Sequence, residues 1–416
     1  MLLACASLVP ACAGEGDPAA SGAGLLAPRG TPAHVYVAAH PDDDLLFMNP
    51  DVESAFLSGH AVRTVYVTSG DAGQDASYWQ SREDGIRSAY AAMARVADAW
   101  SCGTITFAAK ASQLCTLSAA PRLSVLFLRL PDAGLAQLWA TDGGPPFWVT
   151  PVASRRTVDG ASDYTRADLV RVLAAVIEDA EPERVGATDG TLAYGDDHTD
   201  HIAAGLFVLD AVHAAHGVPE VRMYRGYSTY QTWSAVPAPE ARNLTLSEHD
   251  AKTRLMTAYS GPPAPGHLYD EWCWRHYSTT SVSGAGALGQ AGRCIDVSGG
   301  AAVAGAAVAA SACSGSPGQR WNVQPDGLVV GLGGLCLTLG PGGTPATLAA
   351  CTGAPGQTWT LLDNGQLHGA GARCVTLDGD GATLRDTACT SQQVGGRLTV
   401  SSSQRWAQIP APGPED

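Results

Sequence analysis

Between about Pro32 and Tyr277, short apolar runs alternate with segments of helical periodicity. The apolar runs predict buried strands over 35–39, 62–69, 124–130 and 184–188. Helical spacing predicts helices over 52–58, 81–96, 167–179 and 201–215. Strands that alternate with helices are typical of βαβ units, so this half of the chain predicts an α/β fold with a mainly parallel sheet. In such sheets, binding sites gather at the carboxyl ends of the strands.

After Ser278 the pattern changes, because helical periodicity disappears and glycine becomes frequent. Three successive segments each contain two cysteines followed by Gln-x-Trp, and their first cysteines are 42 and then 38 residues apart. A period of about 40 residues with short β segments predicts a repeat architecture. In the third segment, Trp406 follows the second cysteine by 17 residues rather than by eight, so this repeat carries an insertion. The boundary between the two halves is predicted near residues 278–284.

Size and charge narrow the possible functions. A chain of 416 residues predicts two or three domains, and its 45% of hydrophobic residues is enough for sizeable cores. The formal net charge of −15 argues against a nucleic-acid partner and against electrostatic docking on anionic lipid. No apolar stretch is long enough to predict a transmembrane helix.

Eleven cysteines are unusual for a protein of a reducing compartment. Six of them recur at near-regular intervals in the three repeats, which predicts a disulfide framework formed in an oxidising compartment. In the first half, Cys102 and Cys115 are predicted to form a local disulfide that closes a small loop. Cys273 has no evident partner and is interpreted as a buried thiol.

The first residues of the chain resemble the apolar part of an export signal, without its charged region. One account is that the true start lies upstream. Residues 9–12 also resemble a bacterial lipobox, in which case Cys12 carries lipid; a plain cleaved signal is the alternative. We therefore expect a bacterial protein exported to the cell surface, either secreted or lipid-anchored. The expected segments are a signal or lipoprotein-like stretch with a tether over 1–30, then domains over 31–278 and 283–410.

Two clusters of histidine and aspartate stand at the ends of predicted elements. The first is His40-Pro41-Asp42-Asp43-Asp44, directly after an apolar strand, and the second is 196–201, at the start of an apolar helix. Each alone is explained by helix capping or by a charged first helical turn. Together in one α/β domain they favour a single divalent-metal site, because imidazole and carboxylate groups suit zinc or a similar ion.

These clusters resemble the PIG-L/LmbE-like family of zinc-dependent N-deacetylases. The resemblance covers about residues 33–230 and extends to Thr68-Ser69-Gly70-Asp71-Ala72-Gly73 and to Arg82-Glu83. It implies a Rossmann-like fold and the removal of acetyl groups from N-acetylated sugars and related amides. This sequence has Asp44 where glutamate is common, and Thr199 where the family usually has proline.

The resemblance also implies a metal site with a general base beside it. His40, Asp43 and His201 are similar to the family's metal ligands, with Zn2+ the expected ion and another divalent metal possible. Asp42 corresponds to the general base that takes a proton from the attacking water. A cation beside that water lowers its pKa, so a carboxylate is a sufficient base.

Five further residues receive roles through the same resemblance. His198 is expected to stabilise the oxyanion or to protonate the leaving amine, and Asp200 to orient it. Asp44 and Asp71 are expected to support the ligands from behind, and Arg82 and Asp71 to hold substrate; a surface ion pair is the alternative for Arg82. Aromatic residues in predicted loops are candidates for a saccharide groove: Tyr78, Trp79, Trp139, Trp148, Tyr194, Tyr227, Tyr230 and Trp233.

The three repeats resemble the ricin-B-type β-trefoil lectin domain, over about residues 283–409. The resemblance implies three disulfides, one in each repeat: Cys294–Cys313, Cys336–Cys351 and Cys374–Cys389. The family's sugar sites use an aspartate shortly after the first cysteine, and here Asp296 is the candidate, whereas Thr338 and Thr376 occupy that position in the other repeats. No aromatic residue lies between the first cysteine and Gln-x-Trp of any repeat, so sugar binding and a structural or protein-binding role both remain open.

The sequence therefore predicts an exported, metal-dependent amidohydrolase of the N-acetylglucosaminyl deacetylase type, which acts on a linear amide C–N bond. Its substrate would be an N-acetylated saccharide, and its trefoil would bind glycan or cell-wall polysaccharide. Two alternatives remain open. One is hydrolysis of a non-sugar amide at the same site, and the other is a non-enzymatic glycan-binding protein of the cell surface.

Overall fold

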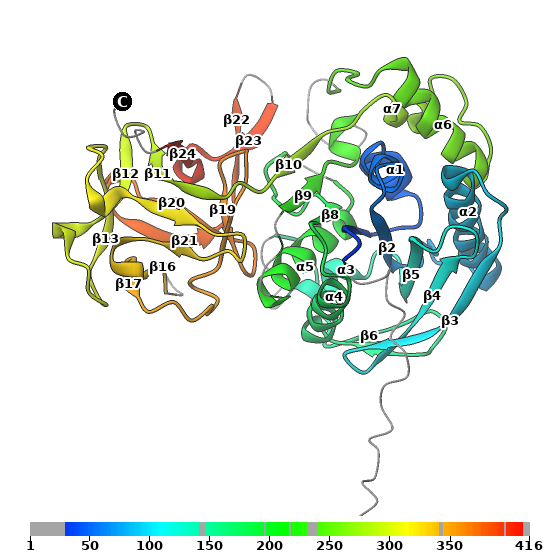
Figure 1. Ribbon diagram of the computed structural model, residues 1–416, viewed down its shortest axis with the longest axis horizontal. Coiled ribbons are helices and arrows are strands. Elements are labelled where there is room, and N and C mark those ends of the chain that lie inside the picture. Colours follow the sequence, from blue (N-terminus) through cyan, green and yellow to red (C-terminus); the bar gives the residue numbers. More distant parts are fainter. Residues whose placement is uncertain are drawn as a thin grey trace, which may run out of the picture.

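The computed structural model describes residues 30–140, 146–194, 197–215, 218, 220–230, 239–340, 344–394 and 397–410. Two domains lie side by side, one of mixed helices and strands and one built of strands (Figure 1). The predicted export segment, its Cys12 and the candidate aromatic Trp233 lie outside the described residues. Within the described residues, no helix is both long enough and apolar enough to cross a bilayer.

The first domain is built on an eight-stranded sheet of order β10-β9-β8-β1-β2-β5-β4-β3. The five central strands β9, β8, β1, β2 and β5 pair in parallel with one another. The edge strands β10, β4 and β3 pair antiparallel to their neighbours. The strands of this sheet are β1 (Ala33–Ala38), β2 (Ala61–Thr68), β3 (Trp100–Phe107), β4 (Lys110–Leu117), β5 (Leu123–Leu130), β8 (Arg184–Thr188), β9 (Glu220–Tyr224) and β10 (Ser278–Thr280). A separate small ribbon pairs β6 (Arg155–Arg156) with β7 (Asp163–Tyr164).

Helices cover both faces of this sheet (Figure 1). One face is covered by α3 (Leu135–Trp139), α4 (Arg166–Ala180) and α5 (Thr199–Ala215). The other face is covered by α1 (Asp51–Leu57), α2 (Ala76–Ala94), α6 (Leu246–Ser260) and α7 (Leu268–Cys273), together with the short π-helical turn η1 (Asp44–Met48). The α/β fold with a mainly parallel sheet is thus confirmed.

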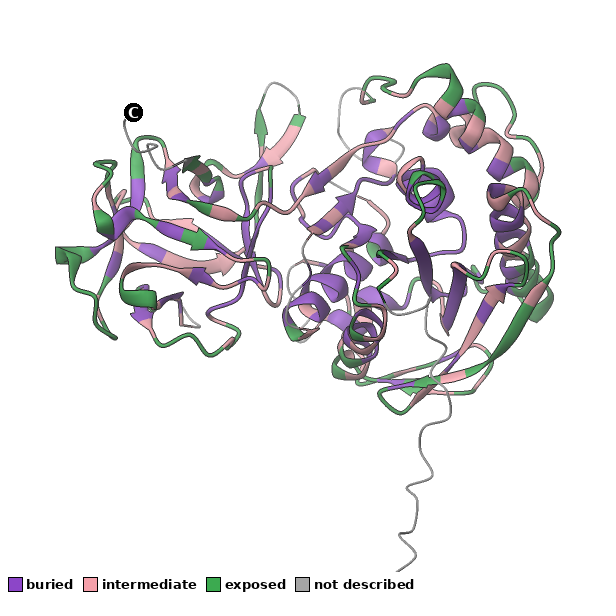
Figure 2. Ribbon diagram, viewed as in Figure 1, coloured by how far each residue is buried: buried purple, intermediate pink, exposed green. Residues whose placement is uncertain are grey.

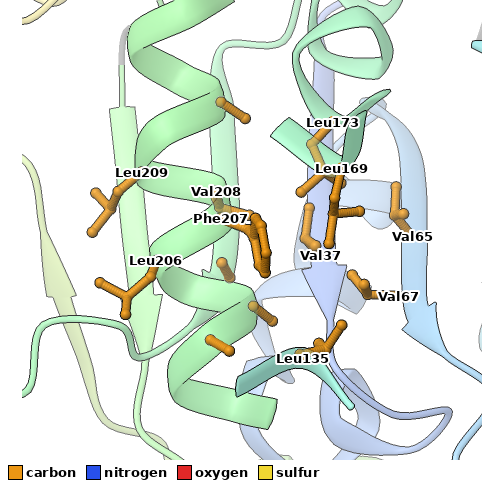
Figure 3. Packing of buried hydrophobic residues seen from close by; sticks show 14 of the residues in the cluster. Val37, Val65, Val67, Leu135, Leu169, Leu173, Leu206, Phe207, Val208 and Leu209 are labelled. Atoms are coloured by element: carbon orange, nitrogen blue, oxygen red, sulfur yellow. The ribbon is translucent and has the colours of Figure 1, made fainter. Parts of the chain in front are cut away.

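Burial on both faces explains why the central strands are apolar runs rather than alternating ones. Strands β1 and β2 are buried throughout (Figure 2), and along β1, Val35 and Val37 pack against α4 and α5, whereas Tyr36 and Ala38 pack into the layer on the other face. Figure 3 shows Val37 of β1 beside Phe207 of α5 and Leu169 of α4.

Two differences from the sequence prediction concern α2 and the β3–β4 hairpin. Helix α2 begins at Ala76 rather than near 81, because Asp75 caps it by accepting from the Ser77 amide at 3.0 Å. The hairpin of β3 and β4 carries no apolar run and was not predicted. Its outer strand is largely exposed, and a disulfide joins Cys102 to Cys115, which lie directly opposite each other.

The second domain consists of short antiparallel strands in three repeats around one core. Trp321, Trp359 and Trp406 are buried in that core. A disulfide joins the two cysteines of each repeat: Cys294–Cys313, Cys336–Cys351 and Cys374–Cys389. The strands are β11 (Gly284–Gln290), β12 (Arg293–Val297), β13 (Val308–Ala312), β14 (Trp321–Val323), β15 (Val329–Val330), β16 (Cys336–Thr338), β17 (Thr347–Ala349), β18 (Trp359–Leu361), β19 (Leu367–Gly369), β20 (Arg373–Leu377), β21 (Leu384–Ala388), β22 (Ser391–Val394), β23 (Arg397–Val400) and β24 (Ala407–Pro410).

Polar contacts join the two domains along α5 and β10. The His213 ring nitrogen Nε2 lies 3.0 Å from Thr360 Oγ1, and the Asp210 carboxylate accepts from the Gly371 amide at 2.9 Å. The predicted insertion of the third repeat forms the β22–β23 hairpin, from which Arg397 pairs with Glu240 of the first domain at 2.7 Å. The insertion therefore contributes to domain docking.

Acidification is expected to weaken this docking. Burial lowers the pKa of His213 to about 4, and burial and the nearby His213 lower that of His368 to about 3. An exposed histidine has a pKa near 6.5, so between about pH 6.5 and pH 4 the separated domains bind more protons than the docked ones. Docking is therefore fully favoured above pH 6.5 and weakens as the pH falls through this window. We expect the melting temperature of the docked protein to fall between pH 7.5 and pH 5.0.

A His368→Leu variant tests this assignment because it removes one of the two groups at similar volume. Its melting temperature, followed by circular dichroism, should depend less on pH between 7.5 and 5.0 than that of the unmodified protein. Equal pH dependence of the two proteins would exclude His368 as a source of the effect.

Candidate metal centre

The two histidine and aspartate clusters meet at the carboxyl edge of the parallel sheet. His40 follows the end of β1, Asp43 begins the turn into η1, and His201 lies in the first turn of α5. All three side chains are buried. Because the carboxyl ends of parallel strands share one edge of the sheet, segments far apart in sequence come together there.

The ring nitrogens of His40 and His201 and the carboxylate of Asp43 form a compact triangle. His201 Nε2 lies 3.0 Å from Asp43 Oδ1 and 3.2 Å from His40 Nδ1, and His40 Nδ1 lies 3.3 Å from Asp43 Oδ2. Ligands held about 2.0–2.1 Å from a tetrahedral ion lie about 3.3 Å from one another. The triangle therefore fits zinc or a similar ion with one position left open. His198 also lies within reach of such an ion, since one of its ring nitrogens is within 4.8 Å of those of His40 and His201.

The outer nitrogen of His201 is fixed by Asp197. Asp197 Oδ1 lies 2.7 Å from His201 Nδ1, and the same carboxylate accepts from the amides of His198, Gly226 and Tyr227. A carboxylate that accepts from Nδ1 keeps the proton on that nitrogen and leaves the Nε2 lone pair for a metal. Asp197 belongs to the second sequence cluster, but no role was predicted for it.

His40 is held from its other side by two carboxylates. Its Nε2 lies 3.3 Å from Asp132 Oδ1 and 3.5 Å from Asp200 Oδ2. Asp200 is itself fixed by the backbone amides of Ala133 and Leu135, at 2.7 and 3.0 Å. The expectation that the Asp200 carboxylate orients His198 is therefore corrected: this side chain points to His40 and to the loop after β5, and only the Asp200 amide contacts His198.

Asp42 lies beside the ligands and is paired with Arg82. Arg82 Nη2 lies 2.8 Å from Asp42 Oδ1, and the same guanidinium donates to the Gly70 carbonyl at 2.7 Å and to the Tyr259 hydroxyl at 2.9 Å. Burial raises the pKa of Asp42, and Arg82 opposes this rise. Arg82 therefore does not form a surface ion pair. Its pair with Asp42 is mostly buried and holds Asp42, the predicted general base, in place.

His198 accepts a backbone hydrogen bond on its Nδ1 and lines a cavity. Its Nδ1 accepts from the Asp200 amide at 3.2 Å, so the neutral ring carries its proton on Nε2. The ring packs edge-on against His40, with the centroids 4.7 Å apart. Burial, followed by the charges of His40 and His201, lowers the pKa of His198. A neutral ring with a proton on Nε2 is a hydrogen-bond donor.

Without a metal cation, protons shared between the histidines and Asp43 would have to offset the repulsion between their lone pairs and negative charge. Burial works to lower the pKa of His201, but the carboxylates of Asp43 and Asp197 raise it to about 10. Burial works to raise the pKa of Asp43, but His201 and His40 hold it well below its usual range. A divalent cation replaces those protons, so metal binding is expected to release them.

Two residues expected near the ligands serve the loops instead. Both oxygens of Asp71 accept from loop groups: the Asp132 amide and Ser69 hydroxyl at 2.8 Å, and the Gly73 amide at 3.0 Å. Asp71 is not among the described residues that line the cavity, and its contact with substrate stays a prediction. Asp44 accepts from the hydroxyls of Tyr66 and Tyr90 at 3.0 and 2.7 Å, so it anchors η1 to β2 and α2 rather than supporting a histidine.

A cavity of about 510 Å³ opens above the cluster. Of the predicted aromatic residues, Tyr78 and Tyr227 line it, whereas Trp79 and Trp139 are packed in the protein interior. Sequence reasoning missed Asp132 and the aromatic residues supplied by α6 and α7. The described lining residues are His40, Asp42, Tyr78, Ser81, Arg82, Asp132, His198, Tyr227, Tyr259, Ser260 and Tyr269.

In the second domain, the candidate Asp296 is bonded to its own repeat. Its Oδ2 accepts from Gln319 Nε2 at 3.0 Å and from the Ser311 hydroxyl at 2.6 Å. Thr338 and Thr376 accept the equivalent glutamine bond in the other two repeats, at 3.0 and 2.9 Å. In every repeat, the residue two positions after the first cysteine thus accepts a hydrogen bond from the repeat's glutamine. Asp296 differs from the two threonines because it has a second carboxylate oxygen, Oδ1.

Comparison with known protein families decides what these two domains are. The family model described as GlcNAc-PI de-N-acetylase, PIG-L, matches residues 35–212, and that of the ricin-type beta-trefoil lectin domain matches residues 285–406. The chain carries a PIG-L de-N-acetylase domain followed by a ricin-B lectin domain. The cluster of His40, His198, His201 and the neighbouring aspartates is a candidate metal site in the PIG-L domain.

Solved structures resemble each domain separately. Similar to the PIG-L domain are the conserved protein TT1542 from Thermus thermophilus (19% identity over 56% of this chain and 80% of that chain, TM-score 0.34) and the 4-carboxy-2-hydroxymuconate hydratase GalB from Pseudomonas putida (15%, 58% and 83%, 0.36). Similar to the lectin domain is the C-half of the earthworm R-type lectin in complex with GalNAc (12%, 30% and 96%, 0.25). The comparison with curated proteins gave no match.

Proposed function

We propose that the protein is an exported, zinc-dependent deacetylase that removes acetyl groups from N-acetylglucosamine-type saccharides. The observation that carries the proposal is the triangle of His40, Asp43 and His201 beside the Arg82-bound carboxylate of Asp42. Membership of the first domain in the PIG-L family supports metal-dependent deacetylation. An assembled ligand set with an intact base also disfavours the alternative of a purely glycan-binding protein.

The chain's own residues account for the proton movements of amide hydrolysis. His40, Asp43 and His201 would hold a divalent cation, which would act as a Lewis acid toward the amide carbonyl and lower the pKa of a nearby water. Asp42, fixed by Arg82, accepts the proton of that water as its oxygen bonds to the carbonyl carbon. The Nε2–H of His198 donates to the developing oxyanion. Asp42 then returns the proton to the leaving nitrogen as the C–N bond breaks, giving acetate and a free amine.

The lining of the cavity favours an uncharged saccharide over an anionic glycolipid. Among the lining residues that the structure describes, Arg82 is the one arginine or lysine, and its guanidinium already holds Asp42, Gly70 and Tyr259. Four tyrosines supply flat faces and hydroxyls, which suit a sugar ring, whereas a phosphate group would find no free cation among the described lining residues.

Acetate release from N-acetylglucosamine oligosaccharides and from a water-soluble N-acetylglucosaminyl phosphoinositide compares the two substrate classes. We expect kcat/KM for the oligosaccharide to exceed that for the phosphoinositide by at least about tenfold, which corresponds to a single missing charge contact. A preference for the phosphoinositide would contradict the proposed substrate class while leaving the deacetylase activity standing.

The lectin domain implies carbohydrate binding, and we propose that it holds the enzyme on glycan or cell-wall polysaccharide. The four disulfides indicate an extracellular protein. Secretion or lipid anchoring at the surface of a bacterium is the finer proposal.

The Asp296→Thr substitution separates sugar binding from the structural task of this position. Threonine supports the glutamine bond in the other two repeats, so the variant should fold and hydrolyse a small soluble substrate normally. Loss of the second carboxylate oxygen should weaken retention on a glycan column. Unchanged retention would remove Asp296 as the sugar site.

A further inference from the structure

A second cluster of possible metal ligands lies at the opposite end of the sheet from the catalytic centre. His34 is the second residue of β1, His60 directly precedes β2, and Glu183 directly precedes β8. Strands β8, β1 and β2 are neighbours in the sheet, so their amino ends bring these residues together. One possible ligand atom from each lies within 4.8 Å of the other two.

Hydrogen bonds fix which nitrogen of each ring carries the proton. His60 Nδ1 lies 3.2 Å from the carbonyl oxygen of Ala55, which can only accept. His34 Nδ1 lies 3.2 Å from the Tyr36 hydroxyl, which itself donates to the Asp51 carbonyl and therefore accepts from His34. Both neutral rings thus carry their proton on Nδ1 and leave Nε2 with a free lone pair.

The remaining atoms of the cluster are therefore all acceptors. His60 Nε2 lies 3.5 Å from Glu183 Oε2, and the His34 and His60 rings lie 4.5 Å apart, inclined at 41°. Lone pairs and a carboxylate that face one another repel unless a proton or a metal cation lies between them. Two imidazoles and one carboxylate, with the outer nitrogens bonded to a carbonyl and a hydroxyl, form a ligand set of the zinc type.

Exposure and local charge permit a cation to enter. The Glu183 side chain is 60% exposed and that of His60 is 23% exposed, whereas His34 forms the buried floor. Arg184 adjoins the cluster, but its Nε lies 2.6 Å from Glu220 and its Nη1 lies 3.8 Å from Asp51. Carboxylates pair with it, although burial and the charges of Arg184 and Arg222 still lower the pKa of His34, so a bound ion depends on the Glu183 carboxylate for charge balance. The exposed Glu183 can close the remaining distance to a bound ion.

We propose that His34, His60 and Glu183 bind a second divalent ion of the zinc class, which ties together the amino ends of three adjacent strands. This site is independent of the proposed deacetylase activity. An ion that binds the folded protein and not the unfolded chain stabilises the fold, so zinc should raise the melting temperature through this site as well as through the catalytic one.

Zinc content per chain tests the proposal, measured by elemental analysis after equilibration with buffered zinc. We expect two zinc ions in the unmodified protein and one in each of the variants His60→Gln and Glu183→Gln, which should keep their acetate release. The variant Asp43→Asn serves as the matched control, because it should lose the catalytic ion and keep the second. Because Glu183 is largely exposed, the Glu183→Gln variant should fold normally.

Three results would overturn the second site: one zinc in the unmodified protein, two zinc ions in both His60→Gln and Glu183→Gln, or none in a folded Asp43→Asn. The melting temperature provides a second measurement on the same proteins. Added zinc should raise it less in Glu183→Gln than in the unmodified protein, and an equal rise would contradict the proposal. Absence of acetate release from a protein with two zinc ions would contradict only the proposed function.

Discussion

The Asp42→Asn variant will lose most of its turnover while keeping its catalytic metal. Asparagine preserves the shape of the side chain but has no carboxylate to accept a proton from water. General base catalysis of this kind contributes about 10²- to 10⁴-fold to the rate, so kcat should fall by that factor. Asp42 is not part of the ligand triangle, so elemental analysis should find the metal content unchanged.

The matched control is Asp84→Asn, the same change at a largely exposed carboxylate of α2 that pairs with Arg87. Its acetate release should equal that of the unmodified protein. If Asp42→Asn retained more than about a tenth of the original kcat with metal bound, another group would have to be the base. Loss of metal from Asp42→Asn would instead place Asp42 among the ligands.

The Gly226→Ala variant should bind the catalytic metal about 10- to 100-fold more weakly, as expected when an outer partner of a ligand is disturbed. A Cβ at this position would lie 2.7 Å from Asp197 Oδ2 and 2.8 Å from His201 Nδ1. Real Cβ atoms do not approach that closely, so the hydrogen bond that orients His201 must shift. Zinc titration followed by acetate release should show half-activation at a higher free zinc concentration.

Gly103→Ala is the control for this substitution, because a Cβ there meets no atom within 4 Å. Its zinc dependence should match that of the unmodified protein. High zinc should restore most of the activity of Gly226→Ala, since the ligands themselves remain. An unchanged zinc affinity would show that the contact between Asp197 and His201 does not support the metal.

The fold, and the meeting of the His40–Asp44 and 196–201 clusters, could be predicted from the pattern of apolar residues. Continuous apolar runs identify strands buried on both faces, and the carboxyl ends of parallel strands share one edge of the sheet. A cluster after β1 and another at the start of α5 therefore meet. The spacing of Cys294, Cys336 and Cys374 likewise predicted the three repeats, because one disulfide closes each of them.

The roles of the outer carboxylates depend on loop conformation, which periodicity does not determine. Asp197 precedes His201 by four residues, yet its bonds to the amides after β9 become visible only in the folded chain. Asp132 follows the apolar strand β5 at the same sheet edge as His40, and that position was the available signal for it. Asp200 was assigned to His198, and Asp71 to the ligands and the substrate, because neither the amide partners nor the direction of these side chains can be read from residue type.

Acetate release from N-acetylglucosamine oligosaccharides, measured before chelation, after chelation and after zinc is restored, tests the central claim most directly. The account predicts release by the purified protein, its loss on chelation and its recovery with zinc. Release that survives complete removal of the metal would contradict the role of His40, Asp43 and His201. An absence of release from the metal-loaded protein would contradict the proposed substrate.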